Sequence, residues 1–201
     1  MVTCESVLDI HARKGIARIV APLGIRLARI GITPSLVTVV GLAITIAGAV
    51  FLSLGWLAWG AIVGGFGALL DAVDGPLARL TGTESKRGAL LDTVADRVGE
   101  IALWLGLGFY VAGDRQRVIL CLSALATAML IPYIRSKAEG WGAEGRGGIM
   151  GRAERIIFML LFVGLEEFGL SLILPMLWIM VVLNSITVAI RAVRTWSQLA
   201  E

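Results

Sequence analysis

Apolar residues dominate this chain in six long stretches, which short polar joins separate. Most of these stretches approach the ~20 residues that an α-helix needs to cross the apolar core of a bilayer. They lie at about 35–55, 57–80, 88–112, 118–139, 152–166 and 171–193. Thr33 and Pro34 suit the start of the first stretch, as a helix cap and a first-turn proline. The pattern predicts an all-α integral membrane protein with six transmembrane helices.

The stretch from about 7 to 30 has a different pattern. Its apolar residues recur at helical spacing against a basic face, which is typical of an amphipathic helix lying on a membrane surface. The basic residues are Arg13, Lys14, Arg18, Arg26 and Arg29. They would be attracted to an anionic leaflet. Because they also interrupt the first apolar segment, we expect no removable signal, and the first spanning helix would direct its own insertion.

The composition agrees with this interpretation. Of 201 residues, 57% are hydrophobic and 16% are charged, and the mean hydropathy of +0.86 is far from that of a soluble domain. The surface helix and six spans account for nearly the whole chain, so we expect one membrane domain over residues 1–201. The net charge of only +3 does not favour a nucleic-acid partner.

The basic residues also predict the orientation, because lysine and arginine collect on the cytoplasmic side of membrane proteins. With the N-terminus inside, only Arg115 and Arg117 of the 18 lysines and arginines fall outside. We therefore expect a multi-pass protein of the plasma membrane with both termini at the cytoplasmic face.

Four aspartates lie at the cytoplasmic ends of two consecutive spans. Asp71 and Asp74 are three residues apart, and Asp92 and Asp96 are four apart, so each pair shares one helix face. A short turn should make the two spans antiparallel neighbours, with the four carboxylates facing one another. An aspartate at mid-span costs ~2.5 to 3.5 kcal/mol, and like charges add repulsion. Bound cations would relieve both, and an all-oxygen ligand set favours Mg²⁺, Mn²⁺ or Ca²⁺ over zinc.

Small and basic residues surround these aspartates. Gly75 and Ala78 remove bulk from one helix face, although small residues also serve close helix packing in membranes. Arg79 offers a planar fork of donors to a diphosphate. Gly88 would open the next helix and leave its first amides accessible to an anion.

Together these residues resemble the signature of the CDP-alcohol phosphotransferases, integral membrane enzymes of phospholipid synthesis. The matching residues are Asp71, Asp74, Gly75, Ala78, Arg79, Gly88, Asp92 and Asp96. The resemblance implies two Mg²⁺ ions, or Mn²⁺, held by the four aspartates, with Asp96 as the general base. It implies that a CDP-linked lipid, CDP-diacylglycerol, binds at Asp74, Gly75, Ala78, Arg79 and Gly88. It also implies a homodimer, for which Gly60, Gly64, Gly65 and Gly67 would permit close helix contact.

A second basic cluster should lie on the same face of the membrane. It consists of Arg135, Lys137, Arg152, Arg155 and Arg191. A phosphorylated polyol acceptor would need such cations, whereas serine or plain inositol would not; the alternative is that they are positive-inside residues and headgroup anchors. The segment 133–156 resembles the same loop of actinobacterial phosphatidylinositol phosphate synthases, although Arg135 replaces a lysine and Pro132 a serine. This resemblance implies inositol 1-phosphate as the acceptor and CMP as the leaving product.

Three alternatives remain open from the sequence. A phosphatidylglycerophosphate synthase would use glycerol 3-phosphate, which is also an anionic acceptor. An archaetidylinositol phosphate synthase would share the loop and differ in the lipid tails. A divalent-cation transporter could also use carboxylates within the membrane, but the outer halves of these spans carry almost no polar residues to form a path.

Overall fold

The computed structural model describes residues 33–199, and this part of the chain folds into helices joined by short connections. The helices are α2 (Pro34–Ser53), α3 (Leu57–Thr81), α4 (Lys86–Tyr110), α5 (Arg115–Gly140), α6 (Arg152–Glu166) and α7 (Ile173–Leu199). Each corresponds to one predicted stretch, so the prediction of six helices is confirmed. The amphipathic helix predicted at about 7–30 lies outside the described residues.

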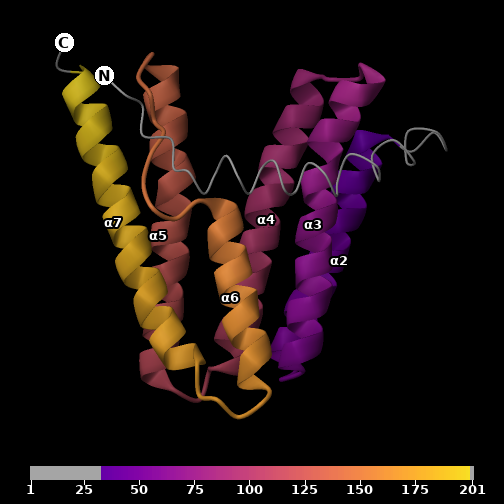
Figure 1. The fold of residues 1–201 in the computed structure, drawn as a ribbon, viewed down its shortest axis with the longest axis vertical. Coiled ribbons are helices and arrows are strands. Elements are labelled where there is room, and N and C mark those ends of the chain that lie inside the picture. Colours follow the sequence, from indigo (N-terminus) through magenta and orange to yellow (C-terminus); the bar gives the residue numbers. More distant parts are fainter. Residues whose placement is uncertain (1–32, 200–201) are drawn as a thin grey trace.

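The helices form two groups with α6 between them (Figure 1). α2 packs closely against both α3 and α4, while α5 packs against α7. α6 contacts α3 and, less extensively, α7. Successive helices run antiparallel, so the α3–α4 turn, the end of α5 and the end of α7 lie at one end of the bundle.

Glycines allow the close approach of α2, α3 and α4. A Cβ added to Gly48 would collide with the backbone of Gly64, and one on Gly67 would overlap Thr45. Gly60 likewise faces Leu52 of α2, whereas a Cβ added to Gly65 would make only an ordinary contact with Leu160 of α6, at 3.7 Å. The predicted close helix contact is therefore found within the chain at Gly60, Gly64 and Gly67, because their missing side chains leave room for neighbouring helices.

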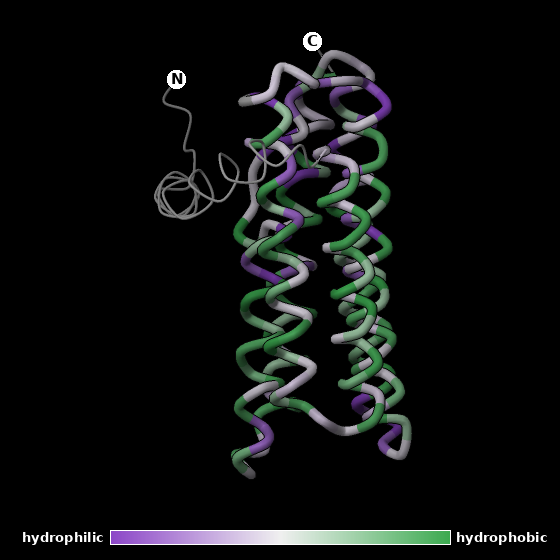
Figure 2. The backbone as a smooth tube through the Cα atoms, turned by 90° about the vertical axis from the view of Figure 1, so that its right-hand side faces the viewer, coloured by the Kyte–Doolittle hydropathy of each residue, from purple (hydrophilic) through white to green (hydrophobic). Residues whose placement is uncertain are grey.

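Four helices of the described region, α2, α3, α5 and α7, are long and apolar enough to cross a membrane. Hydrophobic residues follow most of the bundle's length (Figure 2), as expected of a multi-pass membrane protein. α6 is the exception in length, with 15 residues, because the α5–α6 connection runs back along the bundle before α6 begins. α4 is the exception in composition, because charged residues occupy its first four turns. They are Lys86, Arg87, Asp92, Asp96, Arg97 and Glu100.

Candidate active site

The turn between α3 and α4 sets the aspartates opposite one another. Gly82 ends α3 with a φ of 63°, a left-handed conformation that suits glycine. Ser85 then caps α4, since its hydroxyl accepts the N–H of Gly88 at 3.0 Å. The cap of its own helix therefore already uses the Gly88 amide, while access of an anion to the first amides of α4 stays a prediction.

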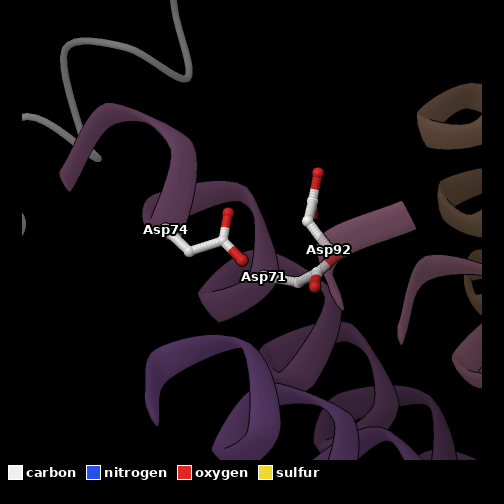
Figure 3. A group of neighbouring side chains, drawn as sticks. All are labelled: Asp71, Asp74 and Asp92. Atoms are coloured by element: carbon white, nitrogen blue, oxygen red, sulfur yellow. The ribbon is translucent and has the colours of Figure 1, made fainter. Parts of the chain in front are cut away.

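Three of the predicted aspartates converge beside this turn. One carboxylate oxygen from each of Asp71, Asp74 and Asp92 lies within 4.8 Å of the other two, and Figure 3 shows these side chains, two from α3 and one from α4. Asp71 and Asp74 are only 7% and 6% exposed. A compact set of carboxylate oxygens without histidine or cysteine fits a hard divalent cation such as Mg²⁺ or Mn²⁺.

A threonine from α2 supports this group. Thr38 is buried, and its hydroxyl lies close to a carboxylate oxygen of Asp74 and 3.1 Å from the carbonyl of Pro34. The ionised carboxylate is the stronger acceptor, so we assign the hydroxyl proton to Asp74. Thr38 was not predicted, because its only signal in the sequence is a hydroxyl near the start of a mostly apolar helix that carries other hydroxyls.

Asp96, the fourth aspartate, lies beside this group and is held by arginines. Arg152, the first residue of α6, forms an ion pair with Asp96, and its Nη1 lies 2.9 Å from Oδ2 of Asp71. Arg97 is 3.5 Å from the other oxygen of Asp96. The four carboxylates therefore lie together as predicted, but as three that are mutually close and a fourth that Arg152 links to Asp71.

The face of α3 beyond the aspartates is open. A Cβ added to Gly75 would meet only Nη1 of Arg79, at 3.8 Å. Ala78 is half-buried and Arg79 is exposed. A ligand could therefore lie against the helix backbone here while contacting both the carboxylates and the guanidinium group.

The predicted acceptor residues do not share one environment. Arg152 lies at the aspartates, as described above. Arg191 is half-buried and donates to the carbonyls of Gly147, at 2.8 Å, and Ile131, at 3.0 Å, which fastens the α5–α6 connection to α5 and α7. Arg135 pairs with Glu139 at 2.8 Å, and the ammonium of Lys137 lies about 6 Å from the rings of Tyr133 and Trp141.

Arg155 occupies a different environment from the one predicted. It is 2% exposed, and it donates through Nε and Nη2 to both carboxylate oxygens of Glu100, at 2.8 and 3.0 Å. Its Nη1 lies 3.4 Å from the carbonyl of Met150. In this structure the donors of Arg155 are therefore directed to Glu100 and Met150, and its predicted contact with the acceptor stays a prediction. Glu100 was missed, since no local pattern distinguishes a buried carboxylate from a solvated one.

Known proteins resemble the chain over most of its length. The profile of the CDP-alcohol phosphatidyltransferase family matches residues 31–193. A phosphatidylinositol phosphate synthase of Mycobacterium marinum is 38% identical over 92% of this chain and 83% of its own length. The enzyme of that name from Streptomyces avermitilis is 34% identical over 98% of this chain and 86% of its own.

Solved structures agree with these relatives. A crystal structure of Mycobacterium tuberculosis phosphatidylinositol phosphate synthase with CDP-DAG bound matches with a TM-score of 0.83 and 36% identity, over 90% of this chain and 94% of the other. The same enzyme in complex with manganese and citrate matches with a TM-score of 0.82 and 34% identity, over 88% of each chain. With its aspartate cluster inside the matched region, the chain belongs to the CDP-alcohol phosphatidyltransferase family.

Proposed function

We propose that this enzyme transfers a phosphatidyl group from CDP-diacylglycerol to a hydroxyl of inositol 1-phosphate, forming phosphatidylinositol phosphate and releasing CMP. The observation that carries the proposal is the position of Arg152, a cation on α6 that reaches Asp96 and Asp71. A negatively charged acceptor bound by Arg152 would bring its hydroxyl beside a carboxylate. The relatives named phosphatidylinositol phosphate synthase support this choice of acceptor.

The donor would bind along the open face of α3. Gly75 and Ala78 leave space beside Asp74, and Arg79 offers donors to the diphosphate. Gly88 lies across the turn. Its amide already donates to Ser85, so Gly88 would offer the donor a close backbone contact and not a hydrogen bond from this amide. The related structure with CDP-DAG bound supports a CDP-linked lipid as the donor.

The four aspartates would hold two divalent ions, Mg²⁺ or Mn²⁺. When bound, the ions would neutralise the diphosphate and stabilise the departing CMP. Asp71, Asp74 and Asp92 already present their oxygens to one another, and Thr38 fixes the rotamer of Asp74. The manganese complex of the related enzyme supports this choice of metal.

Asp96 would act as the general base and accept the proton of the attacking hydroxyl group. Arg152 would hold the acceptor's phosphate through charge-assisted hydrogen bonds. Arg135, Lys137 and Arg191 would be the other members of the basic cluster that faces the acceptor. Arg155 would stabilise this basic cluster from inside the protein, because two of its donors are bonded to Glu100.

The same proposal includes an arrangement in the membrane. Six crossings would place both termini and the active site at the cytoplasmic face of the plasma membrane, with the stretch at 7–30 on the surface. The distribution of lysine and arginine supports this orientation. Residues 1–201 would form one domain, which the family resemblance suggests assembles as a homodimer.

The test is CMP release by purified protein in detergent with CDP-diacylglycerol and Mg²⁺. Inositol 1-phosphate, glycerol 3-phosphate and inositol would be compared, each with an EDTA control. We expect metal-dependent release with inositol 1-phosphate alone. Release with glycerol 3-phosphate instead would retain the chemistry and overturn the acceptor, and release that resists EDTA would overturn the role of the aspartates.

A further inference from the structure

Glu100 is a buried carboxylate that two arginines share. It is 1% exposed, accepts hydrogen bonds from Nε and Nη2 of Arg155, and its Oε2 lies 3.1 Å from Nη1 of Arg97. Leu103, Trp104, Ile156 and Met159 line the space around the Arg155 pair. In such apolar surroundings a carboxylate depends on its partners for stability, so the geometry of the three charged groups is tightly constrained.

One branch of this network leads to Asp96. Glu100 follows Asp96 by four residues and so lies on the same face of α4. Arg97 lies between them, with Nη1 on Glu100 and Nη2 3.5 Å from Asp96. By holding Arg97, Glu100 limits how closely that cation approaches the carboxylate proposed as the base.

The other branch leads to Arg152. Arg155 follows Arg152 by three residues in the first turn of α6, so anchoring one sets the position of the other. α6 packs mainly against α3, and the pair formed by Arg155 and Glu100 ties its first turn to α4. This turn carries Arg152 to Asp96.

We propose that Glu100 is a positioning residue that holds the general base Asp96 and the acceptor-binding Arg152 in their relative placement. The inference rests on the proposed function, because it assigns Glu100 to the acceptor side of that reaction. It touches neither substrate, and it acts through Arg97 on the base and through Arg155 on the acceptor cation.

The test is Glu100→Gln in the full-length protein in detergent, with CMP release measured against each substrate in turn. We expect the acceptor's kcat/KM to fall about tenfold or more, as is usual when a supporting hydrogen-bond partner is lost, with a raised KM for inositol 1-phosphate. The KM for CDP-diacylglycerol should stay within about twofold, because the donor face on α3 is separate from this network. A purely structural role would lower the amount of active enzyme and leave both KM values unchanged.

Two further variants keep the result interpretable. Glu166→Gln is the matched control, because Glu166 accepts the N–H groups of Leu172 and Ile173 at the opposite end of the bundle; both KM values should remain those of the unaltered protein. If Glu100→Gln does not fold, Glu100→Asp retains the charge but is too short to hold both arginines in place, and it should show the same selective rise in acceptor KM.

An unchanged acceptor KM in a folded variant at Glu100 would overturn the inference. An equal rise in both KM values would also overturn it, since the effect would not be confined to the acceptor side. The unaltered protein, assayed in parallel, separates this outcome from failure of the proposed function, in which no CMP would be released with inositol 1-phosphate.

Discussion

At the scale of single residues, the candidate site places like charges unusually close together. Asp71, Asp74 and Asp92 present oxygens within 4.8 Å of one another in a largely apolar protein. Such an arrangement is costly unless cations neutralise it. Bound cations and Arg152 of α6, which lies at Asp71 and Asp96, would together attract a negatively charged substrate to these carboxylates.

The proposed base gives the first prediction. Asp96→Asn should lower kcat by ~10² or more, because general-base catalysis contributes about 10²–10⁴-fold, while CDP-diacylglycerol binding is retained. CMP release and donor binding would be measured on the same preparation. Asp114→Asn is the control, since Asp114 caps α5 and asparagine caps a helix as well as aspartate does. Full activity of Asp96→Asn would reject the assignment of the base.

Arg152 gives the second prediction. Arg152→Gln should raise the acceptor's KM about tenfold or more while affecting the donor's KM less, because a charge-assisted hydrogen bond to phosphate is lost. Initial rates against each substrate check this. The control is Arg115→Gln on exposed surface at the start of α5, where no kinetic change is expected. A rise in the donor's KM alone would move Arg152 out of the acceptor site.

Thr38 gives the third prediction. Thr38→Val keeps the shape and removes the hydroxyl that orients Asp74, so the Mg²⁺ concentration for half-maximal activity should rise ~10-fold or more. A Mg²⁺ titration of CMP release measures this. Thr45→Val is the matched control, because Thr45 is equally buried in α2 and its hydroxyl donates to the carbonyl of Gly41. Identical titrations for the two variants would contradict the role of Thr38.

At the scale of helices, the α2–α3 contact gives the fourth prediction. Gly48→Ala should destabilise the fold by about 1–3 kcal/mol, because the added methyl group would overlap the backbone of Gly64. Thermal unfolding in detergent would show the loss as a lower Tm. Gly113→Ala is the control, since a Cβ there meets nothing within 4 Å. Equal Tm values for Gly48→Ala and Gly113→Ala would contradict this prediction, because α2 and α3 would then accommodate the added methyl group without loss of stability.

Helix ends were predictable because the signals that end a helix are local. Thr33 caps α2 and Ser85 caps α4 through their own side chains, and Gly82 ends α3. Which helices pack together was not predictable in this way. Gly48 and Gly64 have no side chain, so their pairing depends on the placement of two whole helices.

At the scale of the whole molecule, the membrane orientation gives the fifth prediction. In a background in which Cys4→Ser and Cys121→Ser remove the two native thiols, single cysteines introduced by Thr83→Cys and Gly169→Cys should react with a membrane-impermeant thiol reagent from opposite sides of sealed vesicles. The two positions lie in the α3–α4 and α6–α7 connections, at opposite ends of the bundle. We expect Thr83→Cys to react from the cytoplasmic side. Labelling of both from one side would reject the proposed crossings.

The sequence by itself determined the six helices, the shared face of each aspartate pair and the family. These features depend on periodicity, local caps and fixed spacings, which a linear pattern records. Only the tertiary structure decided that Arg152 reaches Asp96 while Arg155, three residues later, is buried against Glu100. The physical reason is that both arginines have the same local character, and their different roles come from α4, whose position relative to α6 depends on the packing of the whole bundle.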